Sequence, residues 1–389
     1  MGNSDKSAGK ILSLDGMRFI AILIIMLSHL EFFGNGDNGY IYTHYLHNAQ
    51  PAVDYFFLLS GFGMMLGFIK RNHNRRSAHV ASISGSIRFG IRHIRKIYPT
   101  YILFLLIGIP YQMQSILQYH DLLHTLVISG GEFVLSIFML QSATGIQQFS
   151  HAFNGPAWFL SSLFVIYLIS PKLMALIHQY FRTIKRIVLG LIANVVIIVV
   201  ISGMFMFVEA KTPFDDFNYS SPWKRVFYVT LGMFIAMLYI HTYQIMRTVY
   251  GDIMCCASFA LSIAWFLARN TVAPGLWMWV YGIDVVLCGV MLYSLAVSDN
   301  VVTRFFSGKE IVWLGGQLAM YLYMSHYLIR MYLDEVFRLY ELRSFPMMLV
   351  EVVLILSLSF LVSTGLYQIQ HRIDSQRGQN RPRHGKSLL

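Results

Sequence analysis

Charged residues are scarce in this sequence. Asp, Glu, Lys and Arg together make up 13% of its 389 residues, whereas hydrophobic residues make up 56%. Soluble domains carry ~25% charged residues, so this composition excludes an ordinary soluble protein. Apolar segments follow one another along most of the chain, which predicts an all-α integral membrane protein. We expect one membrane domain over residues 1–370 and a basic, disordered tail over residues 371–389.

Cysteine is also rare. The three cysteines lie inside apolar segments without the spacing of metal ligands, and we expect them to be core residues. His44 and His47 are three residues apart in a polar loop, but no further ligands cluster around them in the sequence. The sequence also lacks a Gly-rich phosphate loop and a G-x-S-x-G nucleophile elbow. Because neither the cysteines nor these two histidines have the spacing of metal ligands, the sequence predicts no metal site.

Acidic residues are few compared with basic ones, at 19 against 30, which gives a formal net charge of +11. In a soluble protein this balance would suggest a nucleic-acid partner. Here the basic residues gather in segments 70–96 and 172–186 and in the tail after residue 372, as the positive-inside rule expects of cytoplasmic segments. We therefore expect contact with membrane lipid, no nucleic acid, about ten transmembrane helices and cytoplasmic termini.

Several expectations concern single spans. The first span should run from Met17 to Phe33 and be retained, because it contains ionisable groups and no small-residue cleavage site. Asp54 lies near the outer entrance of the second span, where we expect a solvated carboxylate. In the segment from Tyr111 to Gln141, the interruption at residues 130–132 predicts short re-entrant or interfacial helices.

The first span carries costly polar groups, and such groups inside a membrane usually mark function. Arg18 and His29 are eleven residues apart, which on a helix is ~16 Å and about three turns, so both can face one side. Asp15 could form an ion pair with Arg18 at the inner interface. His326 lies in the outer half of a late span, at a depth similar to that of His29. A buried neutral histidine suits a general base, although packing across helices is an equal alternative.

A second basic cluster precedes the third span. Arg88, Arg92 and Arg95 are spaced i, i+4 and i+7, so a helix presents all three on one face. Guanidinium groups make bidentate contacts with phosphates, and this stripe suits a ligand with several of them. Binding of lipid head groups is the equal alternative. Ser60, beside Gly61, is more typical of helix packing, and Trp158 is typical of a span start.

Together these segments resemble the acyltransferase-3 family of integral membrane O-acyltransferases. The family opens with D-G-x-R-x-x-A and a following histidine, and it continues with an F-F-x-x-S-G-F span and an R-x-x-R. The residues that match these motifs here are, in order, Asp15, Gly16, Arg18, Ala21, His29, Phe56, Phe57, Ser60, Gly61, Phe62, Arg92 and Arg95. Later counterparts are Asn154 to Leu160 with Trp158, Arg225 to Gly232, and Gly315 to His326. The resemblance covers nearly the whole chain.

The resemblance implies transfer of an acyl group, commonly acetyl from cytoplasmic acetyl-CoA, to a hydroxyl of a bacterial surface polysaccharide or lipid-linked sugar. It implies a multi-pass protein of the bacterial inner membrane. Arg18, Arg92 and Arg95 would then be donor-side residues, and His29 would be the base. We add Arg88 to the donor side, His326 to the catalytic pair, and as supporting residues Asp15, Ser60, Asn154 and Trp158.

The sequence also departs from the family pattern. Ser161 to Phe164 lacks the glutamate that many members have after the tryptophan, and the last span lacks a frequent Glu before Pro. The carboxylate that would orient the histidine is thus left open. The alternatives are a transporter or flippase of a lipid-linked sugar without acyl transfer, and a membrane sensor that keeps the fold without the chemistry.

Overall fold

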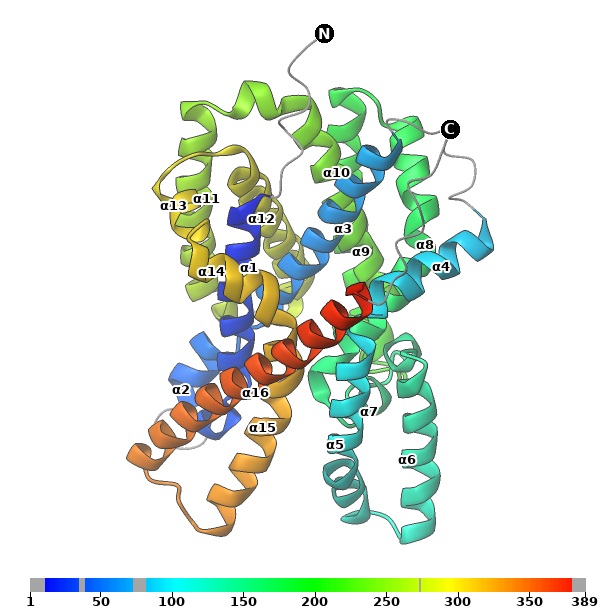
Figure 1. Ribbon diagram of the computed structural model, residues 1–389, viewed down its shortest axis with the longest axis vertical. Coiled ribbons are helices and arrows are strands. Elements are labelled where there is room, and N and C mark those ends of the chain that lie inside the picture. The colour runs from blue at the N-terminus through cyan, green and yellow to red at the C-terminus, as the bar shows by residue number, and fades with distance from the viewer. Residues whose placement is uncertain (1–10, 35–38, 73–81, 273, 380–389) are drawn as a thin grey trace.

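The computed structural model describes residues 11–34, 39–72, 82–272 and 274–379, and these residues form helices and connecting loops without a β-strand. The long helices form one bundle, from which two helical hairpins extend at one end (Figure 1). Their bounds are α1 Leu12–Ser28, α3 Gln50–Asn72, α4 Ile83–Ile94, α5 Tyr98–Leu117, α6 Leu122–Ile137, α8 Trp158–Tyr180, α9 Ile184–Glu209, α10 Pro222–Met246, α11 Val249–Ala268, α12 Trp277–Val297, α15 Ala319–Leu339 and α16 Phe345–Gln379.

Eight helices in the described part of the chain are long and apolar enough to cross a membrane: α3, α5, α8, α9, α10, α11, α12 and α16. The protein is therefore an all-helical, multi-pass membrane protein. The helices that carry the two predicted histidines fall outside this set. α1 has only 17 residues, and the second half of α15 is charged. The count of about ten spans and the cytoplasmic termini stay predictions.

Helices α3 and α10 form the centre of the bundle, where two glycines allow close contact. A Cβ atom on Gly61 would lie 1.9 Å from the carbonyl oxygen of Val229, and one on Gly232 would lie 1.9 Å from that of Leu58. Any side chain at either position would force the helices apart. Small residues serve the same purpose in other membrane helix pairs.

Helix α1 packs against α3, α12 and α15 (Figure 1). Gly16 contacts the carbonyl of Phe306 in α13 (Val301–Phe306), and Gly315 in the π-helix η10 (Leu314–Leu318) contacts the carbonyl of Asp15. The helix begins five residues before the predicted span and ends at Ser28, so the expected end at Phe33 was wrong. His29 is the C-cap residue, where the chain leaves the helix.

Two further expectations are corrected. α6 is continuous through residues 130–132, because both glycines face open space and Glu132 is buried with hydrogen bonds from the amides of Gln112 (2.7 Å) and Gln148 (3.1 Å). The segment is thus a hairpin of α5 and α6. Residues 371–379, expected in a disordered tail, continue α16 as a helix. The rest of the predicted tail lies outside the described residues.

Candidate active site

The structure brings the two predicted histidines together. Nδ1 of His29, at the end of α1, lies 3.3 Å from Nε2 of His326 in α15. Their ring centroids are 5.1 Å apart, and the ring of Tyr327 meets His29 edge-on at 5.3 Å. The His326 side chain is 1% exposed, so the pair has a buried member and a member at the helix end.

Backbone carbonyls fix which nitrogen of each ring carries hydrogen. Nδ1 of His29 lies 2.8 Å from the carbonyl oxygen of Ile25, and Nδ1 of His326 lies 2.9 Å from that of Leu322. A carbonyl oxygen only accepts, so in the neutral rings both Nδ1 atoms carry the hydrogen. His29 then shares its Nδ1–H between Ile25 and Nε2 of His326. Its own Nε2 keeps a lone pair for a ligand.

A large polar cavity adjoins His29. It has a volume of about 810 Å³ and is lined by the end of α1, the loop before α3, the segment before α8, the loop between α9 and α10, and the starts of α12 and α15. The lining combines aromatic rings with carboxylates, amides and imidazoles, including Glu31, His47, Gln50, His151, Trp158, Asp215, Asp216, Tyr219, Arg269, Trp277, Tyr281, Tyr323 and Tyr327. Such a mixture suits a polar ligand that also presents apolar faces.

An ion pair holds a carboxylate close to His29 in the sequence. Arg330, one turn after His326 on α15, donates to Glu31 at 2.5 Å. Glu31 follows His29 by two residues and lines the same cavity. Its negative charge favours a positive imidazole, although the structure shows no direct hydrogen bond between these two side chains among the described residues.

The segment with the predicted supporting residues Asn154 and Trp158 covers α15 beside the histidines. The Asn154 amide donates to the carbonyl of Met324 at 3.0 Å, and the Tyr323 hydroxyl donates to the carbonyl of Pro156 at 2.6 Å. Both contacts lie within three residues of His326. Trp158 is buried and lines the cavity. These residues therefore shape the wall of the site.

Asp54 is not solvated, which corrects the expectation for the second span. Its side chain and that of Arg225 are both 0% exposed, and their charged groups are 2.5 Å apart. Asp54 also accepts from the amide of Gln50 at 2.9 Å, and Arg225 donates to the carbonyl of Tyr219. The pair thus ties α3 to the loop that carries Tyr219 into the cavity. The cost of burying the two charges is offset because the Asp54 carboxylate and the Arg225 guanidinium pair with each other.

Arg18 lies at the other end of α1, paired with Asp15 at 2.8 Å. The Arg18 side chain is 37% exposed, so it is accessible to a ligand. Tyr167 of α8 lies within electrostatic reach of Arg18 and beside the Ser60 hydroxyl, which donates to the carbonyl of Phe56. Ser60 and Arg18 therefore lie in the same region as Tyr167, which is beside the first and in the field of the second.

The stripe of three arginines lies on α4. Arg88, Arg92 and Arg95 are exposed, and α4 is a short helix with a buried face against α8. His93, between them, packs against Tyr167 with ring centroids 4.9 Å apart and ring planes tilted by 40°, and it lies in the field of Arg92. Tyr167 thus links the arginine stripe to Arg18. Burial and the neighbouring arginines lower the pKa of His93, which keeps this ring neutral.

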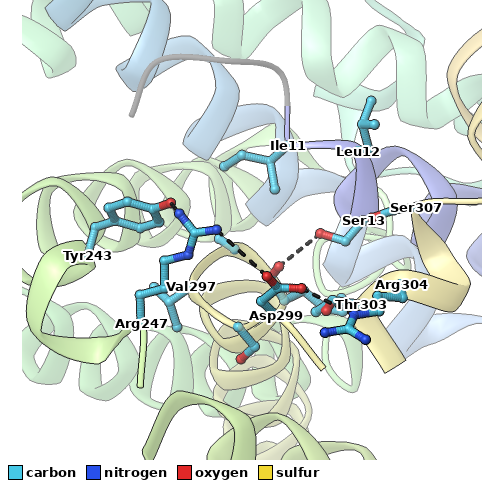
Figure 2. A pocket seen from close by; sticks show the side chains of 13 residues that line it. Ile11, Leu12, Ser13, Tyr243, Arg247, Val297, Asp299, Thr303, Arg304 and Ser307 are labelled. Atoms are coloured by element: carbon cyan, nitrogen blue, oxygen red, sulfur yellow. Dashed lines mark hydrogen bonds and ion pairs between the residues drawn. The ribbon is translucent and has the colours of Figure 1, made fainter. Parts of the chain in front are cut away.

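A different pocket lies at the start of α1, with a volume of about 300 Å³ (Figure 2). Its two arginines, Arg247 and Arg304, both approach the carboxylate of Asp299, at 3.8 and 3.4 Å. Figure 2 shows Tyr243 completing this chain through its hydroxyl, 2.8 Å from Arg247. Both guanidinium groups already interact with the carboxylate of Asp299. This pocket therefore suits an anion less well than the stripe on α4.

The predicted site residues therefore form two groups. Among the described residues that line the His29 cavity, none is Arg18 or an arginine of the α4 stripe. Ile22 and Ile25 are buried on the face of α1 that Arg18 and His29 share. The two groups lie eleven residues apart along α1, which is ~16 Å.

Sequence reasoning missed several residues of the site. Glu31 and Arg330 were not singled out, although each lies within one turn of a predicted histidine. Asp216 pairs with His151 at 3.6 Å in the cavity, and nothing in the local sequence relates these two positions. Tyr219 lies in the loop before α10, and burial raises its pKa to about 12.

Comparison with known proteins identifies the family of the chain. No curated protein and no solved structure matches the chain. The model of the acyltransferase domain family, acyltransferase-3, matches residues 11–368, which include both histidines and all four arginines. The match covers nearly the whole sequence and confirms the resemblance found in the motifs. The chain belongs to the acyltransferase-3 family and is a membrane acyltransferase of that family.

Proposed function

We propose that this protein is an O-acyltransferase of the bacterial inner membrane that moves an acyl group, acetyl in the simplest case, from cytoplasmic acyl-CoA to a hydroxyl of a surface polysaccharide or lipid-linked sugar. One observation carries the proposal. His29 lines a large polar cavity and its Nε2 has no hydrogen bond to any described residue, while its Nδ1–H is held from behind by Ile25 and His326.

In this proposal Nε2 of His29 removes the proton of the acceptor hydroxyl. The hydroxyl oxygen attacks the thioester carbonyl carbon and forms the new C–O bond. The C–S bond then breaks, and the thiolate of CoA takes the proton from His29. The products are the acyl ester and free CoA, and His29 returns to its neutral state.

His326 acts through His29 and is a positioning residue. Its Nε2 accepts from Nδ1–H of His29, which holds the ring orientation and favours the positive imidazole formed during transfer. Glu31 adds a nearby negative charge, and Arg330 holds that carboxylate in place. Together they take the part that a carboxylate orienting the histidine would play.

The lining of the cavity supports a carbohydrate acceptor. Sugar rings have apolar faces that stack on aromatic side chains and hydroxyls that need hydrogen-bonding partners. Trp158 and Trp277 offer such faces, and Asp215 and Asp216 offer acceptors. Tyr219, protonated at neutral pH because its pKa is about 12, adds a donor.

The arginines support the donor side of the proposal. Arg92 and Arg95 present exposed guanidinium groups, and Arg18 lies near them through Tyr167. The phosphates of CoA would bind there. Since ~16 Å of α1 separates Arg18 from His29, the extended arm of CoA would have to span that length to bring the thioester to the cavity.

The test is release of free CoA from acetyl-CoA by the purified protein in vesicles that contain a lipid extract of the host envelope. The proposal predicts release in the wild type and loss with His29→Ala. A transporter or flippase predicts movement of the lipid-linked sugar without any CoA release. Measured flipping with no CoA release in the wild type would therefore refute the proposal.

A further inference from the structure

An apolar groove runs along α1 on a face that the proposed reaction does not use. It has a volume of about 330 Å³ and lies between α1, α3, α11 and α12. On α1 it extends from Met17 to Ile24, which is seven helical steps or ~10 Å. Ile263 in its wall is 60% exposed, and α11 is a candidate membrane span, so the groove opens sideways to the lipid.

The groove and the His29 cavity share a wall that is one ion pair thick. Asp284 lines the groove, Arg269 lines the cavity, and their charged groups are 2.8 Å apart. On α1 the groove ends at Ile24 and the cavity begins at Ile25. A polar chamber and an apolar channel thus meet end to end at Arg269.

Two polar atoms in the groove lack partners. The hydroxyl of Tyr55, a residue only 1% exposed, is buried without a hydrogen bond to any described residue, and so is the hydroxyl of Ser262. Both residues line the groove, from α3 and α11.

We propose that this groove binds the hydrocarbon chain of a lipid-linked glycan, whose sugar lies in the His29 cavity. The proposal rests on the proposed function and specifies its acceptor as a membrane-anchored glycan. The head group would sit among the polar and aromatic residues of the cavity, and the chain would turn at Arg269 and run along α1 toward Tyr55. Arg269 places a cation at the junction of head and chain.

The acyl chain of the donor fits the groove less well. A donor chain entering from the Arg18 end would leave its thioester near Tyr55, which lies in the field of Arg18. The thioester would then be about two helical turns from His29, because the groove ends at Ile24 and not in the cavity. The chain of an acceptor does not need to come near His29, because the reacting hydroxyl is on the sugar, which stays in the cavity.

The test uses the full chain in phosphatidylcholine vesicles and two photoreactive lipids. One is a prenyl diphosphate-linked N-acetylglucosamine with a diazirine in the prenyl chain, and the other is phosphatidylcholine with a diazirine in an acyl chain. We expect the prenyl probe to label groove residues such as Phe259 and Met291. Ser262→Trp and Ile24→Trp, which fill the groove from α11 and α1, should reduce this labelling at least tenfold.

Leu261→Trp is the matched control, because Leu261 is 59% exposed and lies outside the groove. It should leave the labelling unchanged. Equal labelling of the same residues by phosphatidylcholine would mean an ordinary bilayer lipid and would overturn the proposal, as would unchanged labelling in both groove-filling variants. Labelling needs no acyl transfer, so a labelled groove in a protein that never releases CoA would refute the proposed function while leaving this inference intact.

Discussion

Nδ1 of His29 and Nε2 of His326 lie 3.3 Å apart although 297 residues separate them in the sequence. The contact depends on the register of α1 against the segment that leads into α15. Gly315 sets that register, because its Cα packs so closely on the carbonyl of Asp15 that a Cβ atom would lie 1.8 Å from the oxygen. Asp15, Arg18 and His29 all lie on or at the end of this one helix, so the Gly315 contact helps to place all three.

Replacing His326 should show whether its ring positions His29 for catalysis or only packs between helices. His326→Leu removes the acceptor for Nδ1–H of His29, and we expect kcat to fall by about 10²-fold with little change in KM. His326→Gln offers an amide oxygen at a similar place and should recover about a tenth or more of the lost activity. CoA release at saturating acetyl-CoA measures both. Equal loss in both variants with matched thermal stability would contradict the hydrogen-bonding role.

The arginine stripe should determine donor affinity. Arg92→Ala combined with Arg95→Ala removes two charge-assisted contacts to phosphate, and we expect the KM for acetyl-CoA to rise about 10- to 100-fold. Both side chains are exposed, so the fold should be unaffected. Arg304→Ala removes a surface arginine that pairs with Asp299 and serves as the control. An unchanged KM in the double variant would argue for binding of lipid head groups instead.

The buried pair of Asp54 and Arg225 should matter for stability. Asp54→Asn leaves the Arg225 charge buried without its partner, which costs about 3–5 kcal/mol. We expect a clear drop in the melting temperature in detergent. Glu335→Gln breaks an exposed pair with Arg338 and should change the melting temperature little. Similar melting temperatures for the two variants would contradict the buried pair.

The contact between α3 and α10 can be tested with two neighbouring glycines. Gly61→Ala would bring a Cβ atom to 1.9 Å from the Val229 carbonyl oxygen, and the resulting overpacking should cost about 1–3 kcal/mol or more. Gly63→Ala meets open space and should be tolerated. Denaturation in detergent compares the two, and equal stability would show that α3 and α10 are not packed this closely.

Much of the fold follows from the sequence, because long apolar segments in a membrane have few alternatives to helices. The residues at which each helix begins and ends do not follow from the sequence. Apolar character continues past Ser28, so only the folded chain shows that α1 stops before His29. Gly130 and Gly131 suggested a break, yet α6 continues because nothing crowds them and Glu132 finds partners.

The sequence could predict which site residues lie together only where they are on one helix, because helical spacing shows that they share a face. Arg18 and His29 share a face by helical period, and the arginine stripe is readable in the same way. The pairing of Asp54 with Arg225, and of Glu31 with Arg330, joins residues more than 150 positions apart. No periodicity in one segment encodes such contacts. The position of His326 inside a predicted span singled it out, whereas only the structure shows that it lies behind His29.

The most direct measurement is CoA release from acetyl-CoA by the wild type and by His29→Ala in vesicles containing host envelope lipid, with melting temperatures recorded for both. His29 takes the proton of the acceptor in the proposed reaction, so the variant should lose at least 10³-fold in rate while its melting temperature stays close to that of the wild type. A folded His29→Ala protein that releases CoA at the wild-type rate would contradict the role of His29.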